Sequence, residues 1–291
     1  MAKVINFGSL NIDKVYQLPH IVRPGETISS TDYNIWCGGK GGNQSIALAR
    51  AGVDVRHAGC VGNDGTMLTD NLRDNGVNTE LVKITDEPSG HAIIQVDAQG
   101  ENSIILYPGA NHAITSEQIE NVINSAKTGD FLLLQNEINL NELIMEKAYA
   151  AGMNICFNFA PFDYAAAEKL PLQYVKILMV NEQEGAELAG AAQPETIISK
   201  LLEQYPEMVV VITLGSKGAI CGAGNSRFSV ASPVVDAVDT TCAGDTFIGY
   251  FMKAYINNQP LEICLKTGCS AAAISVCRQG ASNSIPFVHE V

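Results

Sequence analysis

The sequence lacks any cluster of basic residues. Its 291 residues include 18 Lys and Arg against 31 Asp and Glu, which gives a formal net charge of -13. Nucleic acids and anionic membranes are bound mainly through Lys and Arg, so this balance argues against both as partners. No apolar run approaches the 18 or so residues of a membrane span, and MAKVINFGSL resembles neither a signal nor a transit peptide. We therefore expect a cytoplasmic protein that holds any anionic substrate by local contacts.

Several common motifs are also missing. The eight cysteines form no Cys-x-x-Cys pair and no Cys/His metal spacing, which predicts reduced, packed thiols rather than a metal or disulfide framework. The P-loop pattern Gly-x-x-x-x-Gly-Lys-Ser/Thr does not occur, and neither does Gly-x-Gly-x-x-Gly. The second absence argues against a dinucleotide-dependent oxidoreductase.

Short apolar runs predict the strands of a parallel sheet. They are apolar almost throughout, as is typical of strands covered by helices on both faces, and they occupy residues 3–10, 131–135, 154–159, 176–181 and 208–215. Helix-like stretches lie between them, with Thr115 capping 116–126 and Asn139 opening 140–151. This alternation predicts an open α/β fold.

Two segments, 14–36 and 81–107, break that rhythm. The second alternates between polar and apolar residues around Ala98-Gln99-Gly100, which predicts a β-hairpin. Alternation of polar and apolar residues is typical of strands with one solvent-exposed face, or with a face that closes over a ligand. No linker or repeat separates the parts, so we expect one domain over residues 1–291 with a small β-sheet lid inserted in it.

Polar residues and glycines follow the first strand. Asn11 and Asp13 could bind vicinal hydroxyls at the carboxyl end of that strand, or could form a turn or helix cap. Further on, Gly38-Gly39-Lys40-Gly41-Gly42-Asn43 precedes a helical run. Four glycines in six residues let the backbone approach a small polar ligand closely, whereas a structural turn would need only one or two.

A second site is predicted at the start of a later helix. Residues 239–247, Asp-Thr-Thr-Cys-Ala-Gly-Asp-Thr-Phe, place small residues where backbone N–H groups are unpaired and the helix dipole favours an anion. Asp245, in the first turn, could accept a proton from an attacking hydroxyl, or could be a capping carboxylate. We expect the helix start to keep its pKa low. Such a base suits phosphoryl transfer, where catalysis is mostly positioning and electrostatics.

Three weaker signals also follow apolar strands. Residues 213–218, Thr-Leu-Gly-Ser-Lys-Gly, could meet nucleotide phosphates through backbone amides and Lys217, or could form a plain hairpin turn. Asn181 and Glu184 offer the hard oxygen atoms that Mg²⁺ and its waters prefer, although an acidic helix start explains the same residues. Glu137 adds a carboxylate at another strand end.

In this order, the segments resemble the ribokinase family of carbohydrate kinases, also called the PfkB family. The specific marks are Asn-Ile-Asp at 11–13, Gly-Gly-Lys-Gly-Gly-Asn at 38–43 and the motif at 239–247, and the resemblance covers essentially the whole chain. It implies a doubly wound α/β domain with a β-sheet lid, which often forms a homodimer interface. The implied activity is transfer of the ATP γ-phosphoryl group to a sugar hydroxymethyl group, with Mg²⁺ and a K⁺-type monovalent cation as cofactors.

The resemblance also implies residue roles. Asp245 matches the catalytic base, and the backbone amides of Cys242, Ala243 and Gly244 match the anion hole. Residues matching the sugar site are Asn11, Asp13, Gly38, Gly39, Lys40, Gly41, Asn43, Glu137 and again Asp245. Residues matching the nucleotide site are Asn181, Thr213, Gly215, Ser216, Lys217, Gly218, Gly244 and Cys269, with Glu184 linked indirectly to Mg²⁺. Residues matching the monovalent-cation site, several through backbone carbonyls, are Asp239, Thr241, Ser275, Arg278, Gly280 and Ser284.

Two positions depart from the family pattern. Cys242 replaces a Gly or Ala, and its thiol, at a helix start, would have a lowered pKa and be open to oxidation or alkylation. Cys269 stands where many ribokinases have His near the adenine.

The expected acceptor is a small neutral sugar, with D-ribose first, because a sugar phosphate would need a second cationic pocket. Nucleoside kinases and fructose-type kinases of the same family are alternatives, and Tyr33, Trp36 or Tyr107 could supply an aromatic slot for a base. A non-catalytic sugar or nucleotide sensor on the same scaffold is an alternative of another class.

Overall fold

The computed structural model describes residues 3–291 and contains two β-sheets. The main sheet has nine strands in the order β13-β12-β11-β10-β9-β8-β1-β4-β5. Seven of them are parallel, and the hairpin β12–β13 adds an antiparallel edge. The strands are β1 (Val4–Phe7), β4 (Val55–Gly62), β5 (Asn78–Thr85), β8 (Phe131–Gln135), β9 (Asn154–Asn158), β10 (Val175–Asn181), β11 (Val209–Thr213), β12 (Ala219–Ala223) and β13 (Ser226–Val230).

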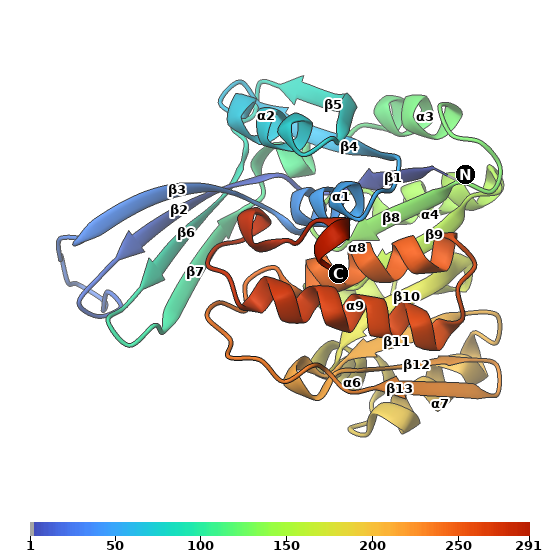
Figure 1. Cartoon of the computed structure of the whole chain (residues 1–291). Helices are drawn as coiled ribbons and strands as arrows, with labels where there is room; N and C mark the ends of the chain where they lie inside the picture. Colours follow the sequence, from blue (N-terminus) through green and yellow to red (C-terminus); the bar gives the residue numbers. More distant parts are fainter. Residues whose placement is uncertain (1–2) are drawn as a thin grey trace.

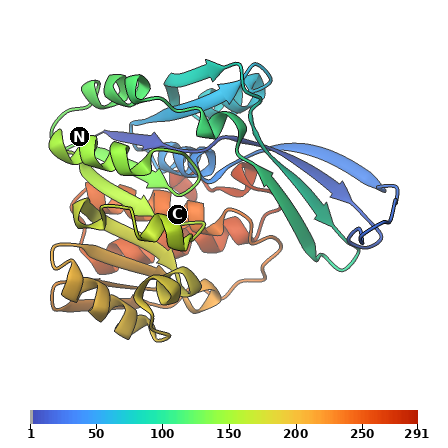
Figure 2. The same cartoon turned by 180° about the vertical axis from the view of Figure 1, so that it is seen from behind.

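Helices cover both faces of the main sheet, as the apolar strands predicted. One face packs against α1 (Lys40–Arg50), α2 (Thr66–Asp74), α8 (Ala243–Ile256) and α9 (Leu261–Val276) (Figure 1). Figure 2, from behind, shows the face that packs against α3 (Ser116–Asn124), α4 (Asn141–Ala150) and α7 (Pro194–Gln204). The short helices α5 (Tyr164–Ala167) and α6 (Glu182–Ala189) complete the fold. Within residues 3–291, no helix is both long enough and apolar enough to cross a membrane.

The smaller sheet, here called the lid sheet, projects from one side of the main sheet (Figure 1). Its order is β3-β2-β6-β7, from β2 (Asn11–Gln17), β3 (Asp32–Gly38), β6 (Gly90–Val96) and β7 (Asn102–Tyr107). The hairpin predicted around Ala98-Gln99-Gly100 is confirmed as the β6–β7 connection.

The predicted lid boundaries were wrong at two points. Residues 81–85 belong to β5 at the edge of the main sheet, where a half-covered strand alternates in the same way as a lid strand. Asn11 and Asp13 lie in β2 of the lid sheet, so they are neither a turn nor a helix cap.

Helix caps were predicted with mixed success. Thr115 caps α3 by accepting a hydrogen bond from the Gln118 backbone N–H. Asn139 does not cap α4, because its side chain is held by the backbone of Ile114 and the cap position is taken by Leu140 in a left-handed conformation.

The order of the main sheet creates a switch point beside β1. From β1 the chain continues to β4 and β5 on one side, while β8 to β11 extend on the other. Helix α1 leads from the lid sheet back to β4, and helix α4 follows β8. These two helices cover opposite faces of the main sheet. Ligands of open α/β sheets bind at such a point, outside the carboxyl ends of the strands. Residues 8–11 and 136–137 leave β1 and β8 at this place.

Candidate active site

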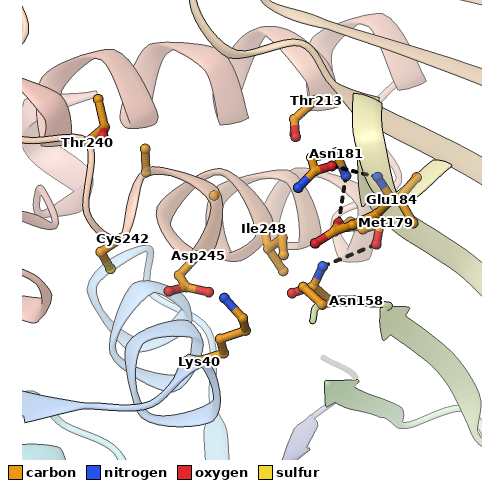
Figure 3. Close-up of a pocket in the computed structure, with 14 residues that line it drawn as sticks. Lys40, Asn158, Met179, Asn181, Glu184, Thr213, Thr240, Cys242, Asp245 and Ile248 are labelled. Atoms are coloured by element: carbon orange, nitrogen blue, oxygen red, sulfur yellow. Dashed lines mark hydrogen bonds between the residues drawn. The ribbon is translucent and has the colours of Figure 1, made fainter. Parts of the chain in front are cut away.

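A pocket of about 240 Å³ lies at the start of α8 (Figure 3). The predicted sugar residue Lys40 meets the predicted nucleotide and anion-hole residues in it. Its lining includes Lys40, Asn158, Met179, Asn181, Glu184, Thr213, Thr240, Cys242, Ala243, Gly244, Asp245 and Ile248, and we call it the Asp245 pocket. Residues from α1, β9, β10, β11 and α8, far apart in sequence, therefore share one cavity.

Backbone geometry at the start of α8 exposes the amides that the sequence motif predicted. Cys242 occupies the cap position with a left-handed φ of 67°, and its side chain makes no capping hydrogen bond. The first N–H groups of a helix have no acceptor in the preceding turn, so they can face a bound anion. The Ala243 N–H is the exception, since it donates to Thr240 O across 3.3 Å.

The Asp245 carboxylate is buried and held by two side-chain amides. Gln44 Nε2 donates to its Oδ1 across 2.9 Å, and Asn43 Nδ2 donates to its Oδ2 across 3.1 Å. Burial raises the pKa of Asp245, against the opposing effects of Lys40 and of the two amides. The expectation of a low pKa at the helix start was wrong, because α1 packs against α8 and removes the carboxylate from water.

Cys242 also differs from its prediction. Burial raises the pKa of its thiol well above the ordinary range, and the nearby charge of Asp245 acts in the same direction. The thiol is therefore not activated by the helix start. The reason is again the packing of α8 against α1, which leaves Cys242 only 9% exposed.

Lys40 was predicted on the sugar side, but its side chain enters the Asp245 pocket. Figure 3 shows its amino group beside Asp245 and Asn158. Burial lowers the pKa of Lys40, but the carboxylates of Asp245, Glu137 and Glu184 together outweigh burial and raise it. The ammonium group is therefore charged, and it is stabilised by the charges of these three carboxylates.

The remaining sugar-site residues surround Glu137 at the switch point. Glu137 Oε2 accepts hydrogen bonds from the Ser9 hydroxyl and from the Lys40 backbone N–H, the latter across 3.0 Å. Asp13 lies on the lid sheet, where burial and then the charge of Glu137 raise its pKa to about 7. Asn11 Oδ1 accepts from Asn111 Nδ2 across 2.7 Å. Asn43, on the same glycine-rich segment as Lys40, donates to Asp245 instead.

The glycine-rich segment is required by close packing. A Cβ atom on Gly41 would lie 2.4 Å from Ser9 N, and one on Gly38 would collide with the Asp13 carboxylate. Gly39 has a φ of +90°, which L side chains rarely adopt. Because these residues have no side chain, the start of α1 can pack directly against the residues that follow β1. Backbone groups can then approach a small ligand closely.

The nucleotide-side residues divide into two groups. Asn181 caps α6 and forms a capping box with Glu184, as an acidic helix start predicts. The two side chains also line the Asp245 pocket. Thr213 lines the pocket as well. The following residues form a short 3-10 turn between the antiparallel strands β11 and β12, in which Gly215, Ser216 and Lys217 are exposed and Gly218 is buried. Cys269, on α9, is 4% exposed within the core and does not line the pocket.

The residues matching the cation site are brought together near α9. Asp239 accepts from the backbone N–H groups of Thr241 and Gly280, at 2.8 and 2.9 Å. The Ser275 and Ser284 hydroxyls are 2.8 Å apart and fully buried. The Arg278 side chain instead forms an ion pair with Glu290, so only its backbone could take part in a cation site.

Sequence reasoning missed several buried amides around Asp245. Gln44 and Asn158 meet beside the carboxylate, but neither belongs to a pattern that marks a site. Gln44 lies within an otherwise helix-like run, and Asn158 ends an apolar strand. Their only sequence signal was a polar residue placed where burial was expected.

Comparison with known proteins agrees with this geometry. The model of the pfkB family of carbohydrate kinases matches residues 1–287. A ribokinase from Haemophilus influenzae is 35% identical over 293 residues, covering 97% of this chain and 95% of the relative. The crystal structure of ribokinase from Thermotoga maritima is 35% identical with a TM-score of 0.90, covering 100% and 98% of the two chains. Arabidopsis thaliana ribokinase complexed with ribose and ATP is 30% identical with a TM-score of 0.88, covering 99% and 97%.

The fold, the Asp245 pocket and these matches define a phosphotransferase that acts on sugars. The chain belongs to the pfkB family of carbohydrate kinases. It is thus an ATP-dependent sugar kinase, and the predicted family and doubly wound fold are confirmed.

Proposed function

We propose that this protein is a ribokinase, which transfers the γ-phosphoryl group of ATP to the 5-hydroxyl of D-ribose and releases ribose 5-phosphate and ADP. The observation that carries the proposal is the buried Asp245 carboxylate, which touches Asn43 of the sugar-side segment and opens into the pocket formed by the start of α8. The ribokinases from Haemophilus influenzae and Schizosaccharomyces pombe, at 35% and 36% identity, and the Arabidopsis thaliana ribokinase complexed with ribose and ATP support ribose as the acceptor.

In the proposed reaction, Asp245 accepts the proton of the sugar hydroxyl as it attacks the γ-phosphorus. The pKa raised by burial makes this carboxylate a better base than an exposed aspartate, while Asn43 and Gln44 favour its ionised form. Lys40 and the N–H groups of Cys242 and Gly244 stabilise the charge that develops on the transferred group. Ala243 joins the anion hole on release of its long bond to Thr240.

The sugar site suits a neutral polyol. Asn11, Asp13, Asn43 and Glu137 offer carboxylate and amide groups that accept and donate hydrogen bonds to hydroxyls. Burial, together with the charge of Glu137, already raises the pKa of Asp13, and an anionic sugar phosphate would meet the same repulsion from Glu137. The backbones of Gly38, Gly39 and Gly41 shape the wall next to them.

Glu184 fits a metal ion that arrives with the nucleotide. Its Oε2 accepts from the Asn181 backbone N–H, and the carboxylate lines the Asp245 pocket with lone pairs that Mg²⁺ or its waters can use. Among residues 3–291, no group of three or more His, Cys, Asp and Glu side chains could hold a metal ion, so oxygens of the bound nucleotide would have to supply the other ligands. Bound Mg²⁺ would neutralise phosphate charge. Thr213, Gly215, Ser216, Lys217, Gly218 and Asn181 are assigned to the nucleotide, with Cys269 behind its site.

A K⁺-type ion fits beside the start of α8. The loop is tied by Asp239, whose carboxylate holds the Thr241 and Gly280 backbones, and by the Ser275–Ser284 contact. An ion there would be held largely by backbone carbonyls of this loop, with the Arg278 side chain turned away. It would order the loop that begins the anion hole.

The lid sheet supports assembly into a homodimer. Pairing and strand alternation place Ile35 and Ile105 on the face opposite Asp13, together with Tyr33 and Tyr107, and all four are 44% to 58% exposed. A second copy would cover this apolar face. We also propose one domain over residues 1–291 with the lid inserted, and a reducing cytoplasmic location consistent with eight free thiols.

Coupled measurement of ADP production tests the function. Purified protein with Mg-ATP is offered D-ribose, D-fructose, adenosine, uridine and fructose 6-phosphate, each with K⁺ or with Na⁺ alone. Ribose-dependent, K⁺-stimulated turnover is expected. Preference for a nucleoside would make a nucleoside, rather than ribose, the phosphoryl acceptor. Trp36, which pairs with Asp13 on the same lid face, would then contact the nucleobase. Silence across the panel with ATP still bound would replace the proposal with a sensor role.

A further inference from the structure

A chain of buried side-chain amides lies beneath Asp245. Gln44 on α1, Gln135 at the end of β8 and Asn6 in β1 are each 0% exposed, and we call these three residues the amide chain. Gln135 Nε2 donates to Asn6 Oδ1 across 2.9 Å and to Gln44 Oε1 across 2.7 Å. Gln44 Nε2 then donates to Asp245 Oδ1. The central strands of the sheet are thereby linked to the proposed base.

A backbone carbonyl fixes the direction of the amide chain. Asn6 Nδ2 donates to Gly41 O across 2.7 Å, and a carbonyl oxygen can only accept, so Asn6 must turn its own oxygen towards Gln135. Gln135 must then present its nitrogen to Asn6 and to Gln44. Gln44 in turn is left with its nitrogen facing Asp245. Each step excludes the flipped amide, in which two oxygens would face each other.

A second carbonyl gives the same orientation from the other side. Asn158 Nδ2 donates to Met179 O across 3.1 Å, so Asn158 Oδ1 faces inward and accepts from Gln44 Nε2 across 3.0 Å. Both hydrogens of the Gln44 amide are thus assigned, one to Asn158 and one to Asp245. Two separate backbone carbonyls, Gly41 O and Met179 O, therefore lead to the same orientation of the Gln44 amide.

This arrangement leaves one buried group unsatisfied. Gln135 Oε1 finds no hydrogen-bond partner among the described residues, and an unpaired buried carbonyl is unfavourable. Turning the Gln135 amide over would not relieve it, because its oxygen would then meet the oxygens of Asn6 and Gln44. Gln135 Oε1 therefore stays unpaired in the folded protein, and the Gln44 amide keeps its nitrogen directed at Asp245.

We propose that Gln44 is a positioning residue that holds the Asp245 carboxylate ionised and aimed at the sugar hydroxyl, and that Gln135 acts through Gln44. The inference rests on the proposed role of Asp245 as base. Asn43 restrains one carboxylate oxygen and Gln44 the other, so the plane of the carboxylate is fixed. Donation from the two amides also opposes the effect of burial, which raises the pKa of Asp245.

The first test is Gln44→Met, which keeps the volume but removes the donor. We expect kcat to fall about tenfold to hundredfold, the effect of losing one hydrogen bond to a charged group. The acid limb of the kcat–pH profile should move to higher pH, since the ionised form of Asp245 loses a donor. ADP affinity, measured by calorimetry, should change little. Gln44→Glu fills the same space and should move the acid limb further, because a second carboxyl group faces Asp245.

The second test is a double-mutant cycle with Gln135→Met. Gln135 does not contact Asp245, so its removal should lower kcat only by releasing Gln44. The loss caused by Gln135→Met should therefore vanish in a Gln44→Met background. Two residues that merely support the fold independently would instead give losses that multiply.

Gln118→Met is the matched control. Gln118 on α3 is also a buried glutamine, 6% exposed, and its Nε2 donates to Gly59 O across 2.8 Å, but it lies on the opposite face of the main sheet. Thermal unfolding of all variants separates folded fraction from turnover. Gln118→Met should lower stability and leave the pH profile where it is.

An unchanged acid limb in both Gln44 variants, or losses that multiply in the cycle, would overturn the proposal. These results are distinct from a failure of the proposed function. In that case the wild-type protein would not phosphorylate a sugar, or Asp245→Asn would keep near-normal turnover. If another sugar replaces ribose, the same cycle is run with that sugar.

Discussion

Asn43 and Asp245 lie 202 positions apart in the chain, and a 3.1 Å hydrogen bond from Asn43 Nδ2 to Asp245 Oδ2 joins them. The contact forms because α1 packs directly against α8 on one face of the main sheet (Figure 1). It unites the two most specific segments of the sequence in one buried site. The sugar hydroxyl and the phosphoryl group would meet at this junction.

Asp245→Asn should remove most of the turnover. The amide cannot take up the proton of the attacking hydroxyl, and general-base assistance contributes about 10² to 10⁴ in rate. ADP binding should persist, because the backbone amides of α8 remain. Steady-state kinetics and calorimetry check both expectations, and a variant with near-normal kcat would contradict the base assignment.

Asp13 should make sugar binding pH-dependent. Its pKa is raised to about 7 by burial and by Glu137, so the carboxyl is largely protonated at pH 6 and ionised at pH 8. The ionised form accepts two hydrogen bonds from hydroxyls, so the KM for ribose should fall over this range. Asp13→Asn should raise the KM and abolish its pH dependence. A KM that is flat with pH in the wild type would exclude this role.

The same group should affect the stability of the free protein. A carboxyl whose pKa is higher in the folded than in the unfolded state binds its proton more tightly when folded, so its contribution is present below about pH 4 and is lost as the pH rises towards 7. Relative to Asp13→Asn, the wild type should therefore lose unfolding free energy across that window. Denaturant unfolding at pH 4.5 and 7.5 measures the difference.

Lys40→Met should lower kcat far more than Lys217→Met. The Lys40 ammonium group lies in the Asp245 pocket among three carboxylates, where a developing phosphoryl charge is poorly screened. We expect a loss of about 10² or more. The Lys217 side chain is 74% exposed and 4.0 Å from Glu182, so its contribution should be within about 1 kcal/mol. Equal losses in the two variants would contradict the placement of Lys40.

Cys242 should resist thiol reagents. Its thiol is buried and its pKa is raised, whereas Cys277 is exposed. Mass spectrometry after brief iodoacetamide treatment should find Cys277 modified and Cys242 intact, with turnover unchanged. Cys277→Ser should remove the fast-reacting thiol. Rapid loss of activity through Cys242 would restore the idea of a sensitive thiol in the anion hole.

Charge on the outer lid face should prevent dimerisation. Ile105→Glu and Ile35→Lys each place a charge where a second copy would cover the sheet. Sedimentation should show a dimer for the wild type and a monomer for either variant, with thermal unfolding little changed. Ile263→Glu, at an exposed site on α9, which does not pack against the lid strands, serves as a control that should stay dimeric. A monomeric wild type at micromolar concentration would refute the proposal.

Strands and motifs were predictable where local pattern decides the outcome. The strand at 131–135 and the hairpin around Gly100 match the structure because periodicity and turn residues act within a few positions. The pKa direction of Asp245 and Cys242 was not predictable, because it depends on burial by a helix about 200 residues away. The position of the Lys40 side chain was not predictable for a similar reason, since its backbone N–H donates to Glu137 while its side chain lines the Asp245 pocket.

The contact between α1 and α8 also sets an order of events during synthesis. Asn43 and Gln44 leave the ribosome early, but the carboxylate that accepts their hydrogen bonds is made only at residue 245. Until α8 packs on α1, the two amides lack this partner and their side of α1 is not covered by α8. A nascent chain that ends before α8 could hold the sugar-side groups, yet it could not transfer a phosphoryl group. Catalytic competence therefore arrives late, with the last two long helices.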